Sequence, residues 1–186
     1  MQERLEKMRV IGGKYRHRLL YWPNDNSIRP TKDRIREAIF SALGELNNKS
    51  FLDLFSGSGA IGIEALSRGS NDVYFVDSNV NAIKCISENL KSLEINEDYH
   101  IIKDDYQNVL EMFKKDNKQF DIVFLDPPYQ KGRYIDIVFF LLNNNIVKED
   151  GIIITESDKE LEIEESLFRK VKLYKYGEII VTFFRR

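Results

Sequence analysis

Phe51-Leu-Asp-Leu-Phe-Ser-Gly-Ser-Gly-Ala-Ile-Gly62 is the stretch that decides the fold, because it leads from an apolar strand through a glycine-rich loop into a helix. Gly57, Gly59 and Gly62 satisfy the pattern G-x-G-x-x-G, and Asp77 ends the next apolar run twenty positions after Gly57. In open α/β sheets such a loop lies at the carboxyl end of the first strand and holds a nucleotide-like ligand. We therefore expect an α/β fold with a ligand site at this loop.

Short apolar runs alternate with helical patterns from residue 51 onward. Repeated βα units with apolar strands imply a parallel sheet that helices cover on both faces. Two further strands, separated by Lys175-Tyr-Gly, predict a C-terminal antiparallel hairpin. The fold class is thus α/β and Rossmann-like, with a mostly parallel seven-stranded sheet and a short N-terminal extension. The expected strands are residues 51–55, 73–76, 100–103, 120–125, 151–155, 168–174 and 178–184, and the expected helices are 59–67, 79–93, 106–115 and 135–142.

The glycine pattern and Asp77 would also fit a dinucleotide such as NAD. Asp53 argues against it, because its carboxylate would face a pyrophosphate but would favour a cationic ammonium group. The C-terminal hairpin also stands where a dinucleotide fold continues with a second βαβ half. S-adenosylmethionine, an adenosine joined to an amino-acid zwitterion, fits better. A tight turn whose glycines only allow close packing is the alternative.

Two acids, Asp104 and Asp105, follow the third expected strand, where the ligand of an open α/β sheet would lie. Asp105 is placed to accept a hydrogen bond from the adenine N6 amine, and Asp104 is expected to face solvent. Helix capping by a carboxylate explains the same pair equally well. The predicted cofactor contacts are Asp53, Phe55, Ser56, Gly57, Gly59, Asp77, Ser78, Asp105 and Asp126.

A second motif, Asp126-Pro-Pro-Tyr129, follows the apolar run 120–125. The prolines fix φ and remove two backbone donors, so the carbonyl groups there are free to accept. With a carboxylate before them and a ring after them, they form a slot for a planar amine such as the exocyclic amino group of a nucleobase. The predicted catalytic residues are Asp126, Pro127 and Tyr129, unless the prolines only end a strand.

The first 45 residues carry an excess of positive charge. Residues 1–40 hold ten Lys or Arg and five acids, a balance of +5, so the other 146 residues balance to −7. Such asymmetry indicates that one end meets a polyanion. Residues 8–22 contain no acid and place Tyr15, Tyr21 and Trp22 among cations, which is typical of proteins that bind RNA or single strands. A packed, solvated hairpin is the alternative.

The same region predicts two elements. Arg9-Val-Ile-Gly-Gly and Arg18-Leu-Leu-Tyr indicate a hairpin, and Thr31 predicts the N-cap of a helix with Lys32, Arg34 and Arg36 on its polar face. We expect residues 1–45 to form an RNA-binding extension and residues 46–186 to form the catalytic domain.

Composition excludes several other classes. A chain of 186 residues with 42% hydrophobic and 31% charged content fits a soluble globular protein. Neither a membrane-spanning run nor a signal peptide is predicted. Cys85 is the single cysteine, so no internal disulfide is expected, and no His/Cys cluster predicts a metal site. We expect a reducing, cytoplasmic location.

Four blocks of the sequence resemble the RsmD-like family, bacterial methyltransferases that modify the exocyclic N2 of a guanine in small-subunit (16S) ribosomal RNA. The block 29–40 is more specific to that family than the glycine-rich loop or Asp-Pro-Pro-Tyr, which many amino-methyltransferases share. His17 departs from the family, which usually has glycine there. The blocks are Arg9-Val-Ile-Gly-Gly-Lys14, Arg29-Pro-Thr-Lys-Asp-Arg-Ile-Arg-Glu-Ala-Ile-Phe40, Asp53-Leu-Phe-Ser-Gly-Ser-Gly-Ala-Ile-Gly-Ile-Glu-Ala-Leu-Ser-Arg-Gly69 and Asp126-Pro-Pro-Tyr129.

The resemblance implies a class I methyltransferase that uses S-adenosylmethionine, without metal, and releases S-adenosylhomocysteine. Its partner would be ribosomal RNA or a partly assembled small ribosomal subunit, with no membrane, and a monomer suffices. Asp126 and the Pro127 carbonyl would accept from the N2 amine, and Tyr129 would stack on the base. The predicted phosphate contacts are Arg9, Lys14, Arg16, Arg18, Arg29, Lys32, Arg34 and Arg36.

Two alternatives stay open. An adenine-N6 methyltransferase acting on DNA or RNA would place its amine in the same slot, and a non-catalytic RNA-binding scaffold would keep the fold without turnover. The sequence also leaves open whether Asp126 removes the proton or only stabilises positive charge until water takes it.

Overall fold

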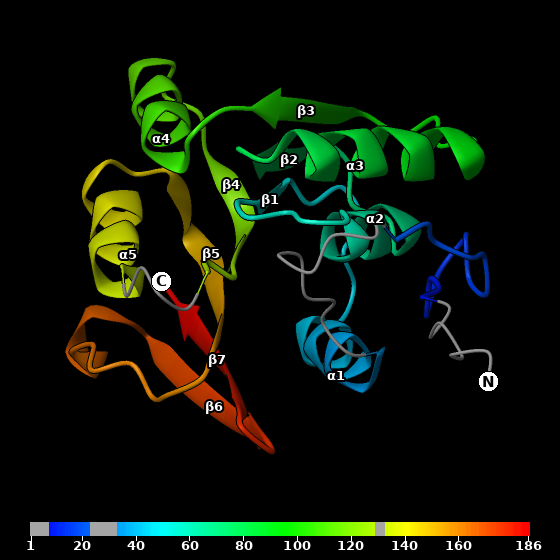
Figure 1. Cartoon of the computed structure of the whole chain (residues 1–186). Coiled ribbons are helices and arrows are strands. Elements are labelled where there is room, and N and C mark those ends of the chain that lie inside the picture. The colour runs from blue at the N-terminus through cyan, green and yellow to red at the C-terminus, as the bar shows by residue number, and fades with distance from the viewer. Residues whose placement is uncertain (1–7, 23–32, 129–132) are drawn as a thin grey trace.

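One sheet organises the protein (Figure 1). Within the residues that the computed structural model describes, 8–22, 33–128 and 133–186, seven strands lie in the order β3-β2-β1-β4-β5-β7-β6. The strands are β1 (Phe51–Asp53), β2 (Val73–Asp77), β3 (Tyr99–Lys103), β4 (Phe120–Leu125), β5 (Val147–Ser157), β6 (Lys170–Tyr176) and β7 (Ile179–Arg185).

The pairing of the strands confirms the predicted fold class. β3, β2, β1, β4 and β5 are parallel, as repeated βα units require, and β7 pairs antiparallel with both β5 and β6. Within the described residues, the expected antiparallel hairpin therefore follows the parallel strands.

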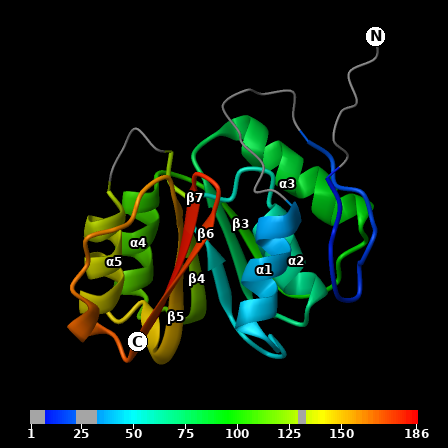
Figure 2. The same cartoon turned by 90° about the horizontal axis from the view of Figure 1, so that it is seen from below.

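Helices cover both faces of the sheet (Figure 2). α1 (Asp33–Leu43), α2 (Ala60–Ser67) and α3 (Val80–Ser92) share one apolar core with Phe51, Phe75 and Phe124, and we call this side of the sheet the α2 face. α4 (Tyr106–Lys115) and α5 (Tyr134–Asn143) pack with Leu52 and Val123 in a second core on the opposite side. A short 3-10 helix, η2 (Glu165–Leu167), lies between β5 and β6.

Several element boundaries differ from the sequence-based expectation, and the differences reach two residues or more in β1, β5 and β6. β1 ends at Asp53 instead of residue 55, because the chain turns into the glycine-rich loop where Ser56 bonds back to Asp53. β5 begins at Val147, four residues before the predicted start, and its pairing with β4 shifts register between Phe120 and Ile122. The polar residues 148–150 hide this first half of the strand from a pattern based on apolar runs.

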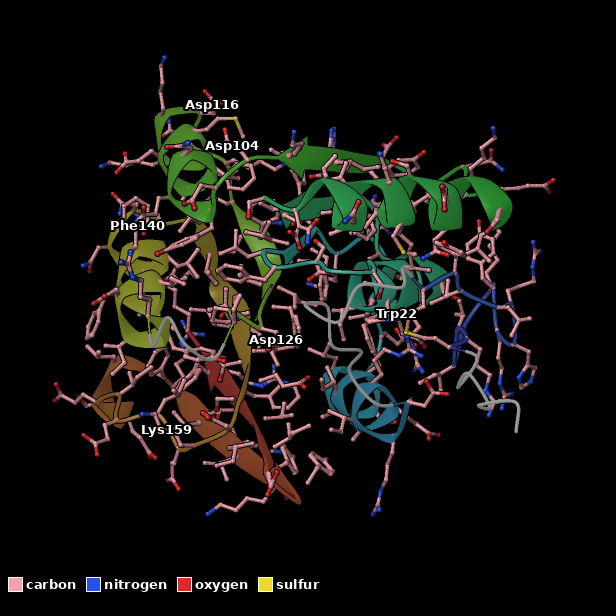
Figure 3. All side chains as sticks on the ribbon, in the orientation of Figure 1. Trp22, Asp104, Asp116, Asp126, Phe140 and Lys159 are labelled. Atoms are coloured by element: carbon pink, nitrogen blue, oxygen red, sulfur yellow. The ribbon has the colours of Figure 1, made fainter. Side chains whose placement is uncertain are left out.

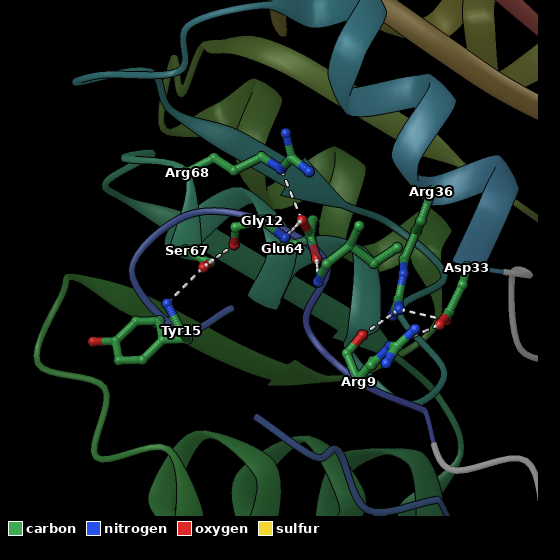
Figure 4. Close-up of polar contacts among 9 residues, drawn as sticks. Arg9, Gly12, Tyr15, Asp33, Arg36, Glu64, Ser67 and Arg68 are labelled. Atoms are coloured by element: carbon green, nitrogen blue, oxygen red, sulfur yellow. Dashed lines mark hydrogen bonds and ion pairs between the residues drawn. The ribbon is translucent and has the colours of Figure 1, made fainter. Parts of the chain in front are cut away.

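The N-terminal extension is held on α2 (Figure 4). Its predicted hairpin reduces to a single bridge between Arg9 and Leu19. Glu64, fully buried on α2, accepts hydrogen bonds from the backbone N–H groups of Ile11 and Gly12, each at 2.8 Å. The extension also contributes apolar side chains to the core of the α2 face, so it packs with the rest of the chain as one unit. These side chains are Met8, Val10, Tyr15 and Leu20.

Candidate functional site

The glycine-rich loop folds as a tight turn between β1 and α2. Gly57 and Gly59 have φ of 53° and 79°, in the left-handed region that glycine adopts without a Cβ penalty. The Ser56 hydroxyl donates to the Asp53 carbonyl at 2.7 Å and accepts from the Val76 N–H at 2.9 Å. Ser56 thereby holds the start of the glycine-rich loop against both β1 and β2.

Asp77 holds the other side of this loop. Its Oδ2 accepts from the Gly57 N–H at 2.9 Å, and its Oδ1 accepts from the Asn79 N–H at 2.8 Å. The side chain is only partly buried, and each carboxylate oxygen retains a lone pair for a ligand hydroxyl. Ser78 follows it and is exposed.

Asp53 is a buried acid at the carboxyl end of β1. It is 1% exposed, and its Oδ2 accepts from the Gly62 N–H at 3.1 Å. Burial, aided by the nearby Asp77 charge, raises its pKa to about 7, against the lowering effect of the Gly62 hydrogen bond. A cationic ligand group at the loop would restore the charged form of Asp53.

Asp126 directly follows β4 near the middle of the molecule (Figure 3). The residue as a whole is partly exposed, but its carboxyl group is withdrawn from water. This desolvation raises its pKa well above the usual range, and the charges of Glu156 and Asp53 add to the effect. Pro127 is buried, whereas Tyr129 lies outside the described residues.

Glu156 is a functional candidate that the sequence reasoning missed. It lies on β5, is 3% exposed, and contributes to the raised pKa of Asp126. Leu125 pairs with Thr155, so the residues that follow them, Asp126 and Glu156, are neighbours on the same side of the sheet. A polar triplet at the end of an apolar strand is the signal that could have found it.

One of the two acids at the third strand caps a helix, as the alternative prediction expects. Asp105 is exposed and caps α4, accepting from the Gln107 N–H at 2.9 Å. Asp104 is exposed, as expected, and accepts from Asn108 at 2.9 Å. The Phe55 ring lies 5.3 Å from the Tyr106 ring, so it stands beside the start of α4. A contact between Asp105 and an adenine stays a prediction.

The residues around the loop fit S-adenosylmethionine by their chemistry. A buried acid suits an ammonium group, and a partly exposed acid at the end of the next strand suits ribose hydroxyls. In the described part of the chain, no group of three His, Cys, Asp or Glu side chains could hold a metal ion. Within residues 8–22, 33–128 and 133–186, no helix is both long and apolar enough to cross a bilayer.

The predicted phosphate contacts divide into surface and buried residues. Arg9, Lys14, Arg16, Arg18 and Arg34 are exposed, although Lys14 also pairs with Glu97 at 2.6 Å. The placement of Arg36 on the polar face of its helix is wrong. Its side chain is fully buried and donates to the Arg9 carbonyl and to Asp33. The bond to Arg9 connects α1 to the extension. Arg29 and Lys32 lie outside the described residues.

The three aromatic side chains of the extension also differ in how far they are exposed. Tyr21 is 57% exposed and available for stacking, and Trp22 is partly buried. Tyr15 is buried, with its hydroxyl donating to Glu97 at 2.6 Å, so its ring fills the core instead of facing RNA. His17 has a φ of 70°, which accounts for glycine at this turn in the family that the chain resembles.

Asn89 links the extension to the glycine-rich loop and was also missed by the sequence reasoning. It is fully buried on α3, and its side-chain amide donates to the carbonyls of Tyr21 and Ser58, each at 3.1 Å. Its Oδ1 accepts from the Tyr21 N–H at 2.6 Å. The end of the basic segment and the glycine-rich loop therefore share one anchor.

Comparisons with known proteins find relatives along nearly the whole chain. A family model described as "Conserved hypothetical protein 95" matches residues 8–185. The protein YlbH of Bacillus subtilis is 36% identical over 94% of this chain and 91% of its own length. Ribosomal RNA small subunit methyltransferase D of Haemophilus influenzae is 34% identical over 83% of this chain and 80% of its own length.

Solved structures show the same architecture. A hypothetical protein of Thermus thermophilus has a TM-score of 0.82 and 27% identity, covering 96% of this chain and 99% of that one. A more distant structure, SMU.776 in complex with SAH, has a TM-score of 0.65 and 14% identity over 82% of this chain and 48% of that one. At that identity, the likeness concerns the fold alone.

Proposed function

The chain belongs to the family described as "Conserved hypothetical protein 95", which holds the small-subunit ribosomal RNA methyltransferase D proteins, and from this premise we propose its substrate and chemistry. It is a methyltransferase that transfers a methyl group from S-adenosylmethionine to the exocyclic N2 of a guanine in 16S ribosomal RNA. The observation that supports this most is the shared face of Asp53 and Asp126, because it sets the predicted cofactor acid beside the predicted amine slot.

The chemistry asks for positioning more than for a strong base. Guanine N2 is a poor nucleophile, because its lone pair is delocalised into the ring. S-adenosylmethionine would supply an electrophilic methyl group on a sulfonium. The protein must hold the amine in line with that methyl group and stabilise the positive charge that develops on nitrogen.

Asp126 is suited to this role. With the Pro127 carbonyl it would accept hydrogen bonds from the N2 amine, and Tyr129 would stack on the base. A raised pKa makes Asp126 a better proton acceptor than an exposed aspartate, so we assign it removal of the proton as well as stabilisation of the charge. Glu156 supports this assignment, because its charge adds to the proton affinity of Asp126.

The exposed cations of the extension would bind RNA phosphates. Arg9, Lys14, Arg16 and Arg18 surround the turn of the extension, and Arg34 lies at the start of α1. Tyr21 supplies an exposed ring for an unpaired base. We propose that ribosomal RNA or a partly assembled small subunit docks here, that a monomer suffices, and that the enzyme acts in the cytoplasm, where that substrate is found.

The test is a methylation assay with labelled S-adenosylmethionine on naked 16S ribosomal RNA and on small subunits that lack the modification. Nucleoside mass spectrometry should find N2-methylguanosine. N6-methyladenosine would favour the adenine alternative, and no transfer to either substrate would favour the non-catalytic scaffold. Comparing the two substrates also shows which assembly state is recognised.

A further inference from the structure

The row of side chains that contains Asp126 continues across the sheet to its edge. Asp126 neighbours Glu156 on β5, Glu156 pairs with Val181 on β7, and Val181 pairs with Tyr174 on β6. Side chains of residues paired directly across a sheet point to the same face, so all four belong to the α2 face. With neighbouring strands about 4.8 Å apart, Tyr174 stands roughly 14 Å from the candidate catalytic acid.

The edge strand β6 presents cations and rings on this face. Alternate residues of a strand share a face, which places Lys170, Lys172, Tyr174 and Tyr176 together. The two lysines are exposed and the two tyrosines are partly exposed. The Tyr174 ring packs edge-on against Phe183 at 5.7 Å, so it is held in position.

The charge of this region differs sharply from that of the chain around it. Residues 168–186 contain six Lys or Arg and one acid, so the C-terminal hairpin is a second basic segment. Lys170 and Lys172 make no ion pair with any residue in the described part of the chain, whereas Lys175, on the opposite face, pairs with Glu160 at 3.6 Å. α1, whose Arg34 is exposed, lies beside the hairpin in both views (Figures 1 and 2).

We propose that β6 is a second RNA-binding surface, on which Lys170 and Lys172 contact phosphates and Tyr174 and Tyr176 contact the bases that flank the target guanine. The inference rests on the proposed function, because it assumes that the target guanine lies at Asp126 and that the RNA runs from there toward β6. A distance of roughly 14 Å corresponds to a few nucleotides of extended chain. Rings with lysines on one sheet face are a common platform for single-stranded RNA.

Lysines on an edge strand also prevent edge-to-edge pairing of sheets. That role explains charge at the edge, but it does not require two tyrosines in line with the catalytic acid. Reversing the charge separates the roles, because glutamate blocks edge pairing as lysine does but repels phosphate. The variant Lys170→Glu/Lys172→Glu therefore tests RNA binding without exposing an unprotected edge.

The experiment measures binding of naked 16S ribosomal RNA by fluorescence anisotropy at several salt concentrations, together with methylation kinetics. The double reversal should weaken binding by at least about tenfold and lower the salt slope by about two. Tyr174→Leu, which keeps an apolar contact with Phe183, should weaken binding about fivefold or more without changing the slope. In both variants the loss should appear in KM for RNA and not in kcat.

A matched control is Lys114→Glu/Lys115→Glu, which makes the same charge change on α4, behind the opposite face of the sheet. If the β6 variants bind RNA as the wild type does, or no worse than this control, the second surface is wrong while the proposed function stands. If the wild type neither binds nor methylates ribosomal RNA, both proposals fall together.

Discussion

A carboxyl group that is withdrawn from water binds its proton more tightly, and two acids of this site show the effect. Burial raises the pKa of Asp53 to about 7 and that of Asp126 well above its usual range. In the unfolded chain both acids would titrate normally. Each therefore costs folding free energy whenever the solution is less acidic than that normal pKa, which points to a functional reason for keeping them.

Asp53→Asn should stabilise the protein and abolish cofactor binding. The folded-state pKa is raised, so stability falls as the pH rises from about 4 to about 7, and a neutral amide escapes this loss. Asn can still accept from the Gly62 N–H. We expect a gain on the order of 2–4 kcal/mol at pH 8, measured by urea denaturation.

Calorimetry with S-adenosylmethionine checks the other half of this prediction. Since an ammonium group favours charged Asp53, wild-type binding should release a proton and should weaken as the pH falls below about 7. The Asn variant should bind at least tenfold more weakly. Equal affinity of the two proteins, or destabilisation by Asn, would show that Asp53 serves the fold and not the ligand.

Asp126→Ala should lower kcat by at least about 10²-fold, the usual contribution of a positioned proton acceptor, and change the cofactor Kd much less. Wild-type activity should fall as the pH decreases through the raised pKa of the Asp126–Glu156 pair, since only the carboxylate accepts. Glu156→Gln removes one source of that shift, so this acidic limb should move to lower pH.

The readouts are pH profiles of kcat and calorimetric cofactor titrations of the same proteins. Asp121→Asn is a control for acid removal, because Asp121 lies at the opposite end of β4 and pairs with Lys148 at 2.7 Å. Its acidic limb should match that of the wild type. Loss of cofactor binding in Asp126→Ala would instead place Asp126 in the cofactor site or the fold.

At the scale of elements, the glycine-rich loop depends on how closely α2 approaches β2. A Cβ on Gly62 would lie 2.3 Å from the Phe75 ring, which is fully buried and has no room to move aside. Gly62→Ala should therefore push α2 away, destabilise the fold by about 1–3 kcal/mol, and weaken cofactor binding by stretching the hydrogen bond from Gly62 to Asp53.

Gly44→Ala separates this contact from ordinary backbone strain. Gly44 has a φ of 76°, and a Cβ at this position would have no atom within 4 Å, so only strain should be measured there. Thermal unfolding should show both variants destabilised, whereas calorimetry should show weak cofactor binding only for Gly62→Ala. A stable Gly62→Ala protein with normal affinity would contradict the close approach of α2.

Elements that are specified by a regular spacing of apolar residues or by a motif could be predicted from the sequence. α4 and β4 begin and end where the pattern places them, since apolar spacing alone decides their burial. The burial of Arg36 could not be predicted, because it depends on the Arg9 carbonyl, which is distant in sequence. Glu156 was missed for a similar reason, because its role depends on Asp126, which follows the neighbouring strand β4.

At the scale of the whole molecule, Glu64 decides whether the extension stays on the catalytic unit. Its two oxygens accept from Ile11, Gly12 and, at 2.7 Å, the Arg68 side chain. Its charge also favours the charged form of buried Arg36, whose pKa burial lowers. Removing a buried acceptor leaves these donors unsatisfied, which costs more than the net value of the bonds themselves.

Glu64→Gln should destabilise the protein by about 2–4 kcal/mol in urea denaturation, because the amide replaces one acceptor by a donor. RNA affinity, measured by anisotropy, should fall with the loss of a fixed extension, while the cofactor Kd stays within a few fold, since Asp53, Asp77 and the loop are untouched. Glu88→Gln, a change at an exposed position of α3, is the matched control and should leave all three quantities unchanged. If Glu64→Gln lost cofactor and RNA binding equally, the extension would be part of the cofactor site and not a separate RNA-binding element built onto it.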